Sequence, residues 1–75
     1  MLVKIKYLHT EANAYGGMSY TYKTELPLAV MDKVLAPTPH GEQRAIVTEV
    51  NVPESDVSAS WASRIRAIEK YDTEG

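Results

Sequence analysis

The sequence predicts a mainly β domain: a small four- or five-stranded antiparallel barrel over residues 1–52, followed by one C-terminal α-helix. Three observations favour this fold class. Short runs of alternating apolar and polar residues recur up to residue 50, and glycine- or proline-containing turns separate them. From residue 57 onward, apolar residues instead recur every three to four positions, which is typical of an amphipathic helix. With 75 residues, the chain has room for one domain.

The first predicted strand covers residues 2–8 and alternates with a period of two, which indicates one buried and one solvent-facing side. A loop over residues 9–17 follows, and its two consecutive glycines supply the conformational freedom that a tight turn needs. The apolar side of this strand consists of Val3, Ile5 and Tyr7, and the other side carries Lys4 and Lys6.

The second predicted strand covers residues 18–25, with Met18, Tyr20 and Tyr22 on one face, and Pro27 ends it because proline cannot donate to a strand ladder. Leu26, Leu28 and Val30 then predict an irregular extended segment over one end of the barrel. The third strand is expected over residues 32–36, ended by Pro37 and Pro39, with a turn at His40, Gly41 and Glu42.

The fourth strand is expected over residues 43–50, and apolar residues on both of its faces suggest packing between the barrel interior and the helix. Residues 53–71 are predicted to form a linker and the C-terminal helix, capped by Asp56 or Ser58, with residues 72–75 frayed. The apolar stripe that would dock this helix on the barrel consists of Val57, Trp61, Ile65 and Ile68, with Tyr71 as an extension.

The arrangement of strands and turns over residues 18–50 resembles that of known small barrels. An aromatic strand at Tyr20–Tyr22, a turn into Asp32-Lys33-Val34 and a glycine hairpin into Ala45-Ile46-Val47 resemble SH3-like or OB-like barrels. The layout is similar to that of small uncharacterised bacteriophage and prophage proteins, and distantly to the N-terminal barrel of the primosomal replication-restart helicase. The glycine usual before the aspartate is Met31 here, so either the turn differs or Met31 is held exposed with a strained backbone.

Composition narrows the function classes. The absence of cysteine excludes disulfides and thiolate zinc sites, and a net charge of −2 argues weakly against a dedicated nucleic-acid binder. The start of the chain lacks an apolar signal core, and no apolar run approaches membrane-spanning length, so we expect a cytoplasmic protein, in the host cytoplasm if it is phage-encoded. No cofactor is expected.

Residues with catalytic potential lack the surroundings that catalysis needs. His9 and His40 lie in separate predicted loops without metal-ligand spacing, and we interpret them as solvated. The carboxylates, Glu42 and Glu49 among them, form no paired motif, and we interpret them as surface charges. Ser55, Ser58, Ser60 and Ser63 fit helix-entry chemistry better than a nucleophile. An enzyme remains only the third hypothesis, for a site shared within an oligomer.

The tyrosines, methionines and lysines are better candidates for functional residues, as binding residues, than the groups with catalytic potential are. Tyr20 and Tyr22 either stack on a ligand or fill the core, and the core is favoured for Tyr22 because the chain has no phenylalanine. Tyr15, beside a glycine pair, is expected at the surface. Met18 is interpreted as packed, and Met31 as exposed.

The preferred hypothesis is a non-catalytic protein-interaction module that binds a protein partner or self-associates through the loop at residues 15–17 and the neighbouring strand edge. The alternative is a single-stranded nucleic-acid-binding barrel for DNA replication or repair, using tyrosines 20 and 22 with Lys4, Lys6, Lys23 and Lys33. The predicted binding residues are Tyr15, Gly16, Gly17, Tyr20, Lys23, Met31 and Lys33.

Overall fold

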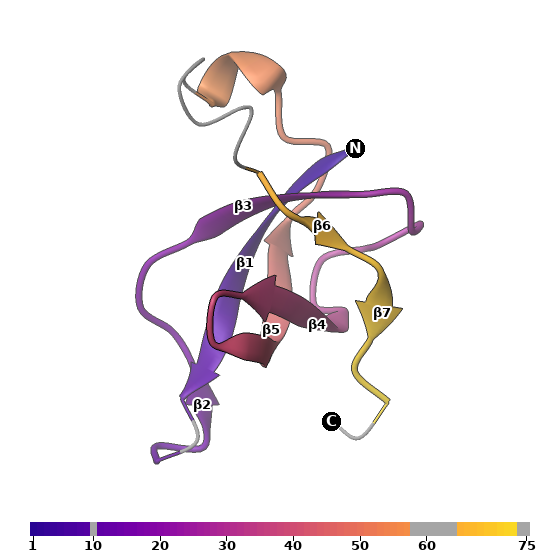
Figure 1. Cartoon of the computed structure of the whole chain (residues 1–75). Helices are drawn as coiled ribbons and strands as arrows, with labels where there is room; N and C mark the ends of the chain where they lie inside the picture. The colour runs from indigo at the N-terminus through magenta and orange to yellow at the C-terminus, as the bar shows by residue number, and fades with distance from the viewer. Residues whose placement is uncertain (10, 58–64, 74–75) are drawn as a thin grey trace.

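The computed structural model describes residues 1–9, 11–57 and 65–73. These residues form seven β-strands and one short 3-10 helix, and four antiparallel strands make up most of the sheet (Figure 1). The elements are β1 (Leu2–His9), β2 (Ala14–Tyr15), β3 (Tyr20–Thr24), β4 (Lys33–Thr38), β5 (Gly41–Glu49), η1 (Glu54–Asp56), β6 (Ala67–Ile68) and β7 (Lys70–Tyr71).

The sheet runs in the order β6-β3-β1-β5-β4-β7, and β2 pairs with the end of β1. All neighbouring strands are antiparallel except β6, which lies parallel to β3. β6 and β7 are consecutive in the chain but sit at opposite edges of this order, because β6 pairs with β3 and β7 pairs with β4. Residues 67–71 therefore connect the two edges and make the sheet a nearly closed barrel.

The barrel interior is filled mainly by the inward side chains of the four long strands, and in β1 these are the ones that the alternation predicts. Tyr22 is buried, which confirms the interpretation of this tyrosine as core. On β5 the core face is the one with Ala45 and Val47, and the half-buried Ile46 lies on the other face. The buried apolar residues are Val3, Ile5, Tyr22, Leu28, Val34, Ala36, Ala45, Val47, Val52 and Ile68.

The predicted C-terminal helix is wrong where the structure describes it. Glu54–Asp56 form a 3-10 turn, and residues 67–71 are extended strands that pair with β3 and β4. Trp61 and the predicted cap at Ser58 lie outside the described residues. Ile68 is fully buried, but as the lining of a barrel strand rather than as part of a helix stripe. The described residues contain no helix long and apolar enough to cross a membrane.

The prediction that Pro37 ends the third strand is wrong. Pro37 lies within β4, opposite Glu42 of β5. Its missing N–H costs nothing where it faces away from a partner, which is how proline is tolerated in strands. The β4–β5 hairpin turns instead at Pro39 and His40, and Gly41 starts β5 with a φ of 106°.

Met31 adopts the conformation that a glycine usually takes. Its φ is 80°, and the Asp32 N–H donates to the Ala29 carbonyl at 3.1 Å, so Met31 is the third residue of a type II turn. The side chain is 70% exposed, as predicted for the methionine that replaces glycine. The Met31 N–H donates to the Val47 carbonyl at 2.8 Å and holds the turn against β5.

Candidate functional site

The hollow with the most exposed aromatic and sulfur-containing lining lies where the barrel is not closed by strand pairing, between β3 and the end of β4. We call it the tyrosine groove, and its volume is about 570 Å³. The lining comes from β1, β3 and its preceding loop, the β4–β5 hairpin, and the segments on either side of residues 58–64. The lining residues are Tyr7, Met18, Ser19, Tyr20, Thr21, Tyr22, Pro37, Thr38, Pro39, Asp56, Val57, Ile65 and Arg66.

The floor of the groove is held by a chain of hydroxyl groups. The Tyr22 hydroxyl donates to the Pro37 carbonyl at 2.8 Å, so the Tyr7 hydroxyl must be the donor in its own hydrogen bond to Tyr22. These two bonds join β1 and β3 to β4 across the barrel end, although β3 and β4 are not neighbours in the sheet. The floor is thereby fixed in shape.

Tyr7 connects this fixed floor to the open rim. Its ring lies 4.9 Å from that of Tyr20, centroid to centroid, at a tilt of 45°. Burial, together with the hydrogen bond and charge repulsion from Tyr22, raises the pKa of Tyr7 well above its ordinary value of 10.0. Tyr7 is therefore a neutral hydrogen-bonding and packing group rather than a base at physiological pH.

The rim of the groove is apolar and exposed. Met18 is 73% exposed and Tyr20 is 43% exposed, and the exposed Pro39 of the hairpin turn lines the same groove. Two charged residues of opposite sign, Asp56 and the exposed Arg66, also border the groove. A rigid floor with exposed aromatic and thioether side chains above it suits the binding of a partner side chain or backbone segment.

The predicted loop at residues 15–17 leads into this groove but does not line it. Tyr15 is half-buried in β2, opposite Leu8. Gly16 is anchored twice, by its N–H to the Tyr7 carbonyl at 3.2 Å and by its carbonyl to the His9 ring at 3.0 Å. The His9 ring also packs on Gly17, where a Cβ would come within 3.2 Å of it. The loop thus positions the following residue, Met18.

The other predicted binding residues lie elsewhere. Strand alternation puts Lys23 and Lys33 on the outer face of the sheet, opposite the face on which Tyr20 and Tyr22 lie. Met31 sits in the type II turn before β4. The structure therefore separates the tyrosines and lysines that the nucleic-acid alternative places on one binding face.

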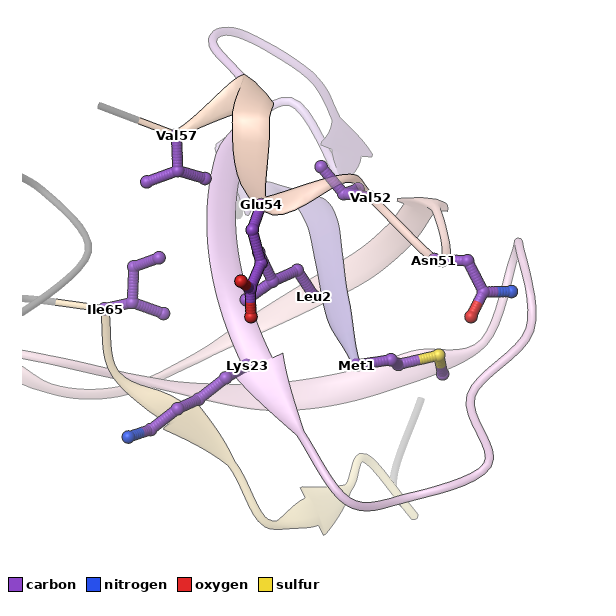
Figure 2. Close-up of a pocket in the computed structure, with 8 residues that line it drawn as sticks. All are labelled: Met1, Leu2, Lys23, Asn51, Val52, Glu54, Val57 and Ile65. Atoms are coloured by element: carbon purple, nitrogen blue, oxygen red, sulfur yellow. The ribbon is translucent and has the colours of Figure 1, made fainter. Parts of the chain in front are cut away.

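A second hollow, of about 740 Å³, lies at the start of β1 (Figure 2). Val57 and Ile65 stand on one side of it, Met1 and Asn51 stand on the other, and Leu2 and Glu54 lie between them. The Met1 amino group is fixed by a 2.9 Å hydrogen bond to the Thr24 carbonyl. No lining residue described there is aromatic, so this hollow offers a partner less than the tyrosine groove does.

The described residues contain no cluster of three or more His, Asp or Glu side chains that could hold a metal ion. His9 ends β1 and His40 lies in the turn between β4 and β5, and both are exposed. No arrangement of nucleophile and base is present in the part of the chain described around the groove, whose titratable lining consists of tyrosines, Asp56 and Arg66.

Sequence reasoning missed the contribution of Pro37, Pro39 and Arg66 to this site. The prolines are interpreted from the sequence only as strand ends, and Arg66 falls outside the apolar stripe of the predicted helix.

Comparison of this chain with protein-family models, with curated proteins and with solved structures finds no match.

Proposed function

We propose that the protein is a non-catalytic interaction module that binds an extended segment of a partner protein in the tyrosine groove. The observation that supports this most is the exposed pair of Met18 and Tyr20 above the hydrogen-bonded floor of Tyr7 and Tyr22. Large aromatic and methionine side chains next to a concave, preformed surface are the usual anchors of protein interfaces.

The rigidity of the floor favours binding. Because the Tyr7 and Tyr22 hydroxyls are already hydrogen-bonded within the protein, little side-chain freedom is lost there when a partner docks. Tyr20 and Met18 then supply most of the newly buried apolar area. We expect affinities in the micromolar range for a short peptide, because the groove is shallow and small.

The chain offers matched controls for the test. Tyr20 and Tyr71 are exposed to nearly the same degree, 43% and 41%, and so are Met18 and Met31, 73% and 70%. Only the first member of each pair lines the groove. Comparing Tyr20→Ala with Tyr71→Ala therefore separates loss of the groove from loss of an exposed tyrosine.

The experiment is a selection of peptides from a displayed random library against the intact protein, followed by isothermal titration of the enriched peptides. Tyr20→Ala should weaken their binding roughly tenfold or more, since truncating an aromatic anchor costs more than about 1 kcal/mol. Tyr71→Ala should leave it unchanged, and both variants should melt within a few degrees of the parent. Equal weakening by the two variants, or no enriched peptide, would contradict the proposal.

A further inference from the structure

We propose that the outer face of the sheet is a second binding site, separate from the tyrosine groove, that binds the phosphate backbone of a single-stranded nucleic acid. The proposal rests on the strand register, which gathers basic side chains from β1, β3, β4, β5 and β7 onto one face. Six of the chain's eight basic residues lie there. They are Lys4, Lys6, Lys23, Lys33, Arg44 and Lys70.

Cross-strand pairs fix this arrangement, because directly opposed residues point to the same side of a sheet. Lys6 of β1 opposes Ile46 of β5, and Ile46 in turn opposes Lys33 of β4. Lys6 and Lys33 therefore flank Ile46, two strand spacings or about 10 Å apart. Two residues nearer the β4–β5 turn, on the same side of the sheet, Arg44 opposes Leu35, and Leu35 opposes Lys70.

Half of these cations are neutralised within the protein. Lys4 pairs with Glu49 at 3.4 Å, Lys70 pairs with Glu42 at 3.5 Å, and Arg44 pairs with the buried Asp72 at 3.4 Å. Lys6, Lys23 and Lys33 have no carboxylate within 4.0 Å in the parts of the chain that the structure describes. These three ammonium groups make the outer side of the sheet positive although the chain has a net charge of −2.

The chemistry of this face favours a nucleic acid over a lipid surface. Leu35 and Ile46, which lie between the cations, are half-buried. Membrane-surface binding needs apolar side chains that protrude, and the most exposed ones, Met18 and Met31, lie outside the strands that form this face. A flexible single strand can follow lysines that are spread over a curved sheet more easily than a stiff duplex can, so a single strand is the expected form.

The test is fluorescence anisotropy of a labelled thymidine oligonucleotide of about 16 nucleotides, titrated with the intact protein between about 50 and 200 mM salt. Three neutralised phosphates predict a log–log salt slope of about −2, which is roughly a twentyfold loss of affinity across this range. Lys33→Gln should reduce the slope by about 0.7. Arg66→Gln is the matched control, since it changes the net charge equally but removes an exposed cation of the tyrosine groove.

A variant that is expected to bind the oligonucleotide more tightly provides a second test. Glu49→Gln removes the carboxylate that competes for Lys4, so it should strengthen oligonucleotide binding several-fold. Absence of binding at about 50 mM salt, or equal weakening by Lys33→Gln and Arg66→Gln, would overturn the proposal. So would equal affinity for a duplex of the same length, or preferential binding to phosphatidylserine vesicles. Peptide binding in the tyrosine groove should not respond to Lys33→Gln, which keeps the two proposals separable.

Discussion

At the scale of single residues, the structure assigns different roles to tyrosines that look alike in the sequence. Tyr22 is core and donates to the Pro37 carbonyl, Tyr7 donates to Tyr22, and Tyr20 lies at the rim with its ring against Tyr7. One face of β3 thus passes from the exposed rim of the groove to the core within two residues. Alternation predicts which side each ring is on, but the end of the barrel decides which rings are covered.

Met31 is the residue whose backbone is least suited to its side chain. A positive φ of 80° costs a non-glycine residue about 1–2 kcal/mol, and its exposed side chain gives up little contact if removed. Glycine's greater conformational entropy in the unfolded chain offsets about 0.5–1 kcal/mol of this relief, so we expect Met31→Gly to raise the free energy of unfolding by up to about 1 kcal/mol, measured by urea denaturation. Val30→Gly, one position earlier in the same turn, should instead lower it by about 0.5–1 kcal/mol. A destabilised Met31→Gly would show that the turn is different in solution.

At the scale of elements, the short strand β7 depends on an ion pair as well as on its ladder. The Asp72 N–H donates to the Lys33 carbonyl at 3.0 Å, and its side chain, only 2% exposed, pairs with Arg44 of β5. Asp72→Ala should lower the free energy of unfolding by about 1–3 kcal/mol, because it leaves Arg44 without this carboxylate in a partly buried position. Glu42→Ala, which breaks the exposed pair with Lys70, should cost less than about 0.5 kcal/mol. Thermal and urea denaturation measure the free energy of unfolding of both variants. Equal losses would mean that burial of Asp72 does not strengthen its ion pair.

Elements whose pattern is local were predictable from the sequence. The period-two runs of β1 and β5 identify both strands and, in β1, the face that is buried. The C-terminal segment was not predictable, because Ile65 and Ile68 repeat at helical spacing, whereas residues 67–71 pair with β3 and β4, which are distant in the chain. Long-range pairing overrides local periodicity in a segment this short.

The same limit applies to the candidate sites. Tyrosines and lysines could be chosen from the sequence as binding residues, but whether they share a face depends on strand register. The structure places Tyr20 and Lys33 on opposite faces of the sheet, so one predicted binding surface becomes two. Pro37 enters the groove only because its carbonyl meets Tyr22 from a strand that is not adjacent in the sheet.

At the scale of the whole molecule, the barrel is closed in two different ways. Tyrosine hydroxyls join β3 to β4 at the end that carries the groove, and residues 67–71 join the same two strands by backbone pairing at the other. Thr24 reinforces the second closure, since its buried hydroxyl donates to the Ile68 carbonyl at 2.9 Å. The open groove and the packed core are thus two consequences of how β3 and β4 are joined.

This closure makes Ile68 a part of the global core although it lies in a two-residue strand. It is 1% exposed and packs in the same cluster as Val3, Ile5 and Val34. We expect Ile68→Ala to lower the free energy of unfolding by about 2–5 kcal/mol, a large share of the roughly 5 kcal/mol that a domain of this size has. Ile46→Ala, on the half-buried outer face, is the control and should cost clearly less.

Hydrogen exchange distinguishes global from local unfolding in the same variant. If the closing segment folds as one unit with the barrel, Ile68→Ala should lower the protection of the central amides of β1 by as much as it lowers that of β6. The reason is that removing the closing strand uncovers the edges of both β3 and β4 and opens the core that β1 crosses. Protection lost in β6 and β7 alone, with β1 unchanged, would show that the barrel core is stable without its closing segment.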